Sequence, residues 1–155
     1  MSPALKTLAA AALIAALPLA ACAVEVTHFP AGAPAGLGPM PVGPPYSAAV
    51  MAGDTLYVAG TTDADPATGR PAADATAAAK VVLDRIRGTV EKAGLTMDDL
   101  VWVQVFTSDV RDFGAFNAVY RSYFHGPMPA RAFIGAGSLL GGAHFEVMGI
   151  AVRRK

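Results

Sequence analysis

The sequence predicts a single α+β domain in which two helices pack on one face of a mixed β-sheet. The length of 155 residues leaves room for one domain. Segments with strand and helix patterns follow one another in the order β-β-α-β-α-β-β. This order, with no internal repeat, is the basis of the prediction.

The first two strands are expected to form a hairpin. Residues 47–51 and 55–61 are rich in strand-forming residues, and Gly53 between them can adopt the positive φ of a tight turn. Residues 65–69, with the sequence Asp-Pro-Ala-Thr-Gly, predict a further turn before the first helix.

Residues 72–93 predict an amphipathic helix. Apolar residues recur every three to four positions, and Gly94 follows where a C-terminal cap residue belongs. The apolar positions are Ala75, Ala79, Val82, Ile86 and Val90.

The second half of the chain predicts a short helical turn from Thr96 to Asp99, three strands and another helix. Residues 101–107 are apolar on both alternating faces, which is typical of a central strand. A helix over 109–124 begins at Asp109, and strands over 131–135 and 144–153 flank a glycine-rich loop. Four aromatic residues of this helix are expected to face the sheet: Phe113, Phe116, Tyr120 and Tyr123.

Residues 1–22 predict an export signal. The apolar run from Leu8 to Leu19 is alanine-rich and too short to span a bilayer of about 30 Å. The small residues before Cys22 resemble the lipobox of bacterial lipoproteins, and lipidation would block the thiol of this single cysteine. We therefore expect an exported periplasmic protein anchored to a membrane through Cys22. The alternative is a plain signal, which would give a soluble periplasmic or secreted protein.

Residues 23–45 predict a linker, and residues 46–155 the folded domain. Six prolines and four glycines fall between Val24 and Pro45, a density that disfavours helix and sheet. The formal net charge is zero, which argues against nucleic acid as a partner because phosphate contacts need a concentrated basic face. The sequence contains no metal-binding constellation of Cys and His residues.

Two charged residues near the C-terminus are candidates for chemistry. Strand alternation places Glu146 on an apolar stripe with His144 and Met148, and a carboxylate there needs a partner. Arg131 opens the neighbouring strand, and its planar fork of donors suits a carboxylate. Either the two residues form a structural ion pair, or they bind a ligand. His144 either lines the same pocket or is exposed at the strand end.

Several motifs together resemble the Rid family, the RidA/YjgF reactive intermediate deaminases, over about residues 44–152. The resemblance rests on the order and spacing of the motifs, including the fifteen-residue step from Arg131 to Glu146. It implies a chorismate-mutase-like fold and a homotrimer with sites in the clefts between subunits. The motifs are Gly43-Pro44-Pro45-Tyr46-Ser47, Asp65-Pro66-Ala67-Thr68-Gly69, Asp112-Phe113 with Asn117 and Tyr120, Pro129-Ala130-Arg131, and Glu146.

The resemblance also implies an activity, which is the hydrolysis of 2-imino acids or their enamine tautomers, such as 2-aminoacrylate, to 2-keto acids and ammonia. No cofactor is expected. In this scheme Arg131 clamps the substrate carboxylate, and Glu146 positions and deprotonates the attacking water. Tyr46 closes the pocket, and the backbone near Gly60 offers hydrogen bonds.

Three positions depart from the family pattern. Phe133 stands where many deaminating members have cysteine, Thr61 ends a segment that often reads Ser-Gly-Gln, and Leu140 stands where a proline is common. These changes predict a bulkier, less polar pocket. The alternative function is therefore a non-catalytic trimeric protein that binds small carboxylates through Arg131. A ribonuclease or holdase activity agrees less well with the neutral charge.

Overall fold

The computed structural model describes residues 23–32, 42–65 and 67–154. The predicted export signal and the predicted lipidation site Cys22 lie outside the described residues, as do residues 33–41 of the predicted linker. No helix in the described part of the chain is long and apolar enough to cross a membrane.

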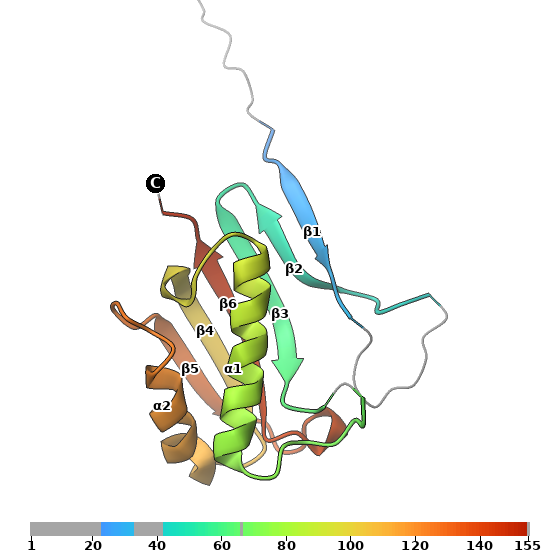
Figure 1. The fold of residues 1–155 in the computed structure, drawn as a ribbon, viewed down its shortest axis with the longest axis vertical. Coiled ribbons are helices and arrows are strands. Elements are labelled where there is room, and N and C mark those ends of the chain that lie inside the picture. Colours follow the sequence, from blue (N-terminus) through green and yellow to red (C-terminus); the bar gives the residue numbers. More distant parts are fainter. Residues whose placement is uncertain (1–22, 33–41, 66, 155) are drawn as a thin grey trace, which may run out of the picture.

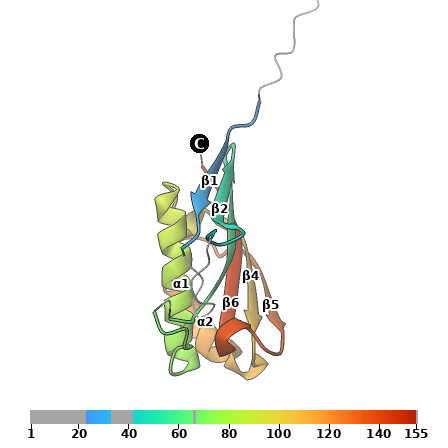
Figure 2. The ribbon, with the colours of Figure 1, turned by 90° about the vertical axis from the view of Figure 1, so that its right-hand side faces the viewer.

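A six-stranded mixed sheet forms one layer, and both helices pack on the same face of it (Figures 1 and 2). The strand order is β1-β2-β3-β6-β4-β5, and only the β4–β5 pair is parallel. The predicted α+β class and the order β-β-α-β-α-β-β are confirmed from β2 onward. The strands are β1 (Val26–Pro30), β2 (Ser47–Ala52), β3 (Thr55–Thr62), β4 (Leu100–Thr107), β5 (Ala130–Gly135) and β6 (Phe145–Val152).

Strand β1 lies inside the segment that we expected to be a linker. It pairs antiparallel with β2, from Val26 opposite Ala52 to Pro30 opposite Ser47. The prediction that residues 23–45 contain no regular structure is therefore wrong for this strand. The prolines concentrate after it, and Pro30 occupies its last position, where the register shifts and an edge strand tolerates proline.

Helix α1 (Ala75–Lys92) agrees with the predicted helix, apart from three residues at its start and one at its end. The side chain of Asp74 caps it by accepting a hydrogen bond from the backbone N–H of Ala77 at 2.9 Å. Gly94 follows with a φ of 74°, as the predicted C-terminal cap requires. The buried face consists of Ala78, Ala79, Val82, Leu83, Ile86 and Val90.

Helix α2 (Phe113–Arg121) is shorter than predicted, because a separate 3₁₀ turn (Val110–Asp112) precedes it. Of the four aromatic residues, Phe116 and Tyr120 are buried in the core. Tyr123 instead donates its hydroxyl to Asp84 of α1 at 2.7 Å. Phe113 stays 48% exposed, so the prediction that all four face the sheet is wrong for these two positions.

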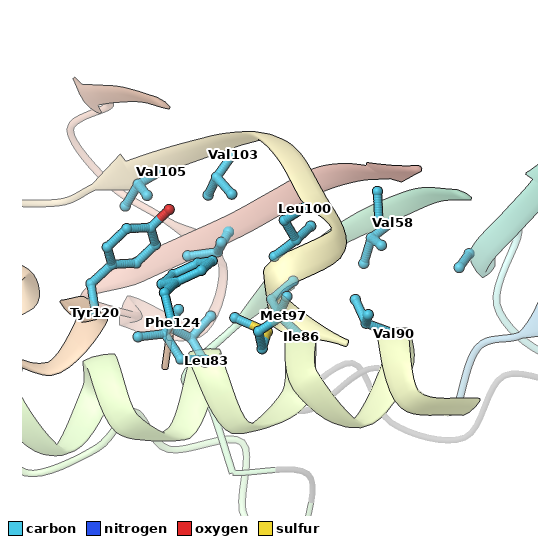
Figure 3. Close-up of a cluster of buried hydrophobic side chains, with 14 of the residues drawn as sticks. Val58, Leu83, Ile86, Val90, Met97, Leu100, Val103, Val105, Tyr120 and Phe124 are labelled. Atoms are coloured by element: carbon cyan, nitrogen blue, oxygen red, sulfur yellow. The ribbon is translucent and has the colours of Figure 1, made fainter. Parts of the chain in front are cut away.

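The core fills the space between the helices and the sheet (Figure 3). Strand β6 alternates: Phe145, Val147, Gly149 and Ala151 are buried on the helix-facing side, whereas the intervening residues are half-buried on the opposite face. No described helix covers that opposite face (Figure 2). It carries Tyr57, Trp102, Phe106, Ile134, Glu146, Met148 and Ile150, and we refer to it as the open face.

Candidate active site

Arg131 lies on the edge strand β5, on the helix-facing side of the sheet. The parallel register places it beside Val103, whose side chain is buried in the core. One guanidinium nitrogen, Nη2, donates a hydrogen bond to Oδ1 of Asn117 on α2 at 2.6 Å. Strand β5 and helix α2 together therefore fix the position of the guanidinium.

Four aromatic rings surround the Arg131 guanidinium. Its Cζ atom lies 4.5 Å from the ring centroid of Tyr120 and 5.8 to 5.9 Å from those of Phe113, Phe116 and Phe133. These distances are within the range of cation–π attraction. Burial lowers the pKa of Arg131, although an arginine remains charged at neutral pH. Among the described residues no carboxylate pairs with it, so its free donors are available to an anionic ligand.

Tyr120 contributes a second polar group next to Arg131. Its hydroxyl is buried and has no hydrogen-bond partner among the described residues. Burial raises the pKa of Tyr120 to about 12, although the nearby positive charge of Arg131 acts in the opposite direction. Asn117 and Tyr120 share one face of α2 because they are three positions apart. Both residues belong to a motif of the family resemblance, but the sequence indicated a core position for Tyr120 and no binding role for either residue.

Phe133 packs against the core instead of standing free in a pocket. Its register partner Val105 is buried on the helix-facing side, and its ring centroid lies 5.6 Å from that of Phe116 and 5.1 Å from that of Phe113. Phe133 therefore forms part of the aromatic surroundings of Arg131, two positions along the same strand.

Glu146 lies on the open face, on β6 between β3 and β4. Its register partners are Thr62 and Phe106. A β-bulge at Ala59 and Gly60 shifts the register of β3 between Val58 and Thr61. A Cβ atom added to Gly60 would collide with Oε1 of Glu146, so the glycine is what allows the carboxylate to lie against the backbone of β3.

Of the other predicted pocket residues, one lies on β3 and the other lies just before β2. Thr61 follows the bulge opposite Val147 and is half-buried. Tyr46 immediately precedes β2 and is exposed. The structure thus brings Gly60 and Glu146 into contact.

Arg131 and Glu146 lie on opposite faces of the sheet. Arg131 pairs with Val103 of β4 on the helix-facing side, whereas Glu146 pairs with Phe106 of β4 on the open face. No ion pair joins them among the described residues. The structural ion pair that the sequence left open does not form within one chain, and one chain does not bring the two residues into one pocket.

His144 is held by Asp63, a buried carboxylate that sequence reasoning missed. Nδ1 of His144 lies 3.2 Å from Oδ2 of Asp63, and this oxygen also accepts a hydrogen bond from the backbone N–H of Ala72. Oδ1 of Asp63 accepts hydrogen bonds from the backbone N–H groups of His144 and Phe145. Asp63 therefore joins the end of β3 to the start of β6. Its 81-residue separation from His144 left no local signal in the sequence.

Comparisons with known proteins define the family. Residues 39–153 match the family described as endoribonuclease L-PSP. A RutC family protein of Haemophilus influenzae is 37% identical over 126 residues, which cover 79% of this chain and 92% of the relative. The 2-iminobutanoate/2-iminopropanoate deaminase of Escherichia coli is 35% identical over 125 residues, which cover 79% and 93%.

Solved structures agree in fold. The YjgF gene product of Escherichia coli aligns with a TM-score of 0.70 at 33% identity, covering 83% of this chain and 99% of that one. Escherichia coli TdcF, solved with bound serine, aligns with a TM-score of 0.70 at 28% identity, covering 83% and 100%.

The match over most of the domain, with the shared sheet and helices, shows that this chain belongs to the endoribonuclease L-PSP family. This family includes the YjgF and RutC proteins, and it is the one that the sequence motifs resemble under the name Rid. Relatives at about 35% identity are imine deaminases by name. Among the described residues, no group of three or more His, Cys, Asp or Glu side chains is placed to hold a metal.

Proposed function

We propose that this protein hydrolyses 2-imino acids, or their enamine tautomers, to 2-keto acids and ammonia. The observation that carries the proposal is Arg131, a half-buried cation held by Asn117 and left without a carboxylate partner. Such a group suits a ligand carboxylate, which can accept two parallel hydrogen bonds from the guanidinium. The names of the deaminase relatives support the same reaction.

We propose further that the complete site forms between the subunits of a homotrimer. The site has two halves, one at Arg131 and one at Glu146, and they lie on opposite faces of one sheet. The open face also exposes large apolar residues, including Tyr57 and Ile134. Burying such a face against another subunit is favourable. In this arrangement Glu146 of one subunit would approach Arg131 of its neighbour.

The proposed reaction follows from the charges of these groups. Arg131 binds the substrate carboxylate and orients the adjacent imine carbon toward the water. Glu146 accepts a proton from the water as the water oxygen bonds to the carbon of the protonated imine, which gives a neutral carbinolamine. Glu146 then returns this proton to the nitrogen, the C–N bond breaks to release ammonia, and the hydroxyl group loses its proton to Glu146, which leaves the 2-keto acid. Tyr46 would close the pocket.

An assay with 2-iminopropanoate generated in situ tests this function. Wild-type protein should accelerate loss of the imine above the spontaneous rate, and Arg131→Ala should lower kcat/KM by at least about a hundredfold, as expected for a lost charged contact. Arg70→Ala, which removes an exposed arginine between β3 and α1, is the control. Imine loss at the background rate with wild-type protein would refute the proposal.

A second candidate function is carboxylate binding without hydrolysis. The observation that favours it is that a single chain presents only the Arg131 half of the site, with Glu146 on the other face. Calorimetry would distinguish the two functions: a carboxylate that binds wild type but not Arg131→Ala, with no imine turnover, supports the binding protein.

We also propose that residues 1–22 direct export and that Cys22 carries a lipid anchor. The apolar run and the small residues before Cys22 support this proposal. Wild-type protein expressed in a bacterial host should fractionate with membranes, and Cys22→Ala should appear in the soluble fraction. A wild-type protein that is soluble after export contradicts the lipid anchor.

A further inference from the structure

We infer that Phe113 determines substrate specificity and that the preferred substrate is a 2-imino acid with a large apolar side chain. This inference rests on the proposed function, because it places the substrate carboxylate on Arg131. It concerns the part of the substrate beyond the carboxylate and the imine.

Phe113 is an exposed aromatic residue beside the carboxylate anchor. Its ring centroid lies 5.8 Å from Cζ of Arg131, and 48% of the residue is exposed. The ring meets that of Phe133 edge to face at 5.1 Å, with an interplanar angle of 85°. Phe133 thus holds Phe113 in place from the core side, while the rest of the ring remains open to a ligand.

Val110 extends the apolar surface beyond Phe113. It is 60% exposed and precedes Phe113 by three positions. Its Cγ1 atom lies 2.8 Å from the point that a Cβ atom on Gly135 would occupy, so the glycine at the end of β5 leaves room for it. Two charged neighbours of this surface, Arg111 and Asp109, form an ion pair with each other at 2.5 Å.

The positions of Arg131, Phe113 and Val110 determine which part of a bound substrate can contact the apolar surface of Phe113 and Val110. A carboxylate bound to Arg131 through two hydrogen bonds places its carboxyl carbon about 4 Å, and its α-carbon about 5.5 Å, from the guanidinium carbon, given ordinary hydrogen-bond lengths. A methyl group on that carbon is too short to cover Phe113 and Val110, whereas a branched or aromatic side chain can pack on both. Burial of the additional apolar area favours the larger substrate.

Binding of stable 2-keto acid products tests this preference without requiring turnover. Calorimetry on the wild-type protein should give 4-methyl-2-oxopentanoate a Kd about tenfold lower than that of pyruvate, as burial of three further carbons allows. Phe113→Ala should reduce this ratio to less than about threefold, mainly by weakening the larger acid, and Phe113→Leu should keep an intermediate ratio. Val26→Ala, an exposed apolar residue on the opposite edge strand β1, should leave the ratio unchanged.

Equal affinity of wild-type protein for the two acids would overturn the inference, and so would an unchanged ratio in a folded Phe113→Ala. Circular dichroism of each variant checks the fold. Failure of the proposed function gives a different result, because the wild type would then lack imine turnover while still preferring the larger keto acid.

Discussion

Arg131 is a partly desolvated cation that donates a hydrogen bond to a neutral amide, that of Asn117. Desolvating a charge without an opposite charge is costly, and the four aromatic rings offset only part of that cost. A substrate carboxylate would supply the missing charge. We therefore infer that strand β5, the amide of Asn117 and the aromatic rings hold the Arg131 guanidinium in a position where it can bind a substrate carboxylate.

Substitution of Asn117 should weaken substrate binding by releasing Arg131. Asn117→Ala removes a hydrogen bond to a charged group, which is worth about 1.5–3 kcal/mol, so kcat/KM should fall by at least about tenfold. Asn117→Asp should be more damaging, because its carboxylate would compete with the substrate for Arg131. The measurement is imine turnover, with the exposed Ser122→Ala as control. An Asn117→Asp variant more active than Asn117→Ala would contradict this role.

At the scale of the elements, the β3 bulge brings Gly60 against the Glu146 carboxylate. Gly60→Ala should displace Glu146 and lower kcat by at least about tenfold, as expected when a general base is misplaced. Gly88→Ala on α1 is the matched control, because a Cβ atom there meets nothing within 4 Å. Replacing a glycine inside a helix by alanine should stabilise the protein by about 0.5–1 kcal/mol. Full activity in Gly60→Ala would show that the carboxylate position is unimportant.

The packing of α2 on the rest of the domain predicts a pH dependence. Burial raises the pKa of Tyr120 to about 12, and burial together with the hydrogen bond to Asp84 does the same for Tyr123. Folding favours the protonated phenols, so their contribution to stability is complete below about pH 10 and is lost as the pH rises toward 12. Phenolate absorbance should show two late ionisations in the wild type and one in Tyr123→Phe. Ionisation of every tyrosine well below pH 12 would contradict this packing.

The elements that the sequence predicted well are those with local signals. The cap at Gly94, the turn at Gly53 and the apolar face of α1 depend on neighbouring residues, and all are confirmed. Strand β1 was missed because the prolines that follow Val26–Pro30 dominated the composition of the segment. The exposure of Phe113 was missed because helical periodicity does not show where the sheet ends.

That Arg131 and Glu146 lie on opposite faces of the sheet could be seen only in the complete sheet. Alternation along each strand was predicted, but the face that each side chain occupies depends on the register of both strands with β4. That register joins segments far apart in the sequence. For the same reason the buried Asp63 and its bonds to β6 could not be predicted.

At the scale of the whole molecule, the two halves of the site are separated by the sheet itself. The helix-facing half contains Arg131, and the open face contains Glu146. Together with the uncovered apolar residues of the open face, this separation supports a site shared between subunits. The central claim is therefore that each working site takes its arginine and its glutamate from different chains.

Complementation between two inactive variants tests this claim most directly. Arg131→Ala and Glu146→Gln should each lack imine hydrolysis, since each removes one half of every site. After unfolding and refolding together in equal amounts, the mixture should recover about a quarter of the wild-type activity, because random assembly of a cyclic trimer pairs the intact halves at that frequency. Co-refolded wild type gives the reference value. Mixed oligomers that form without recovering activity would contradict the shared site.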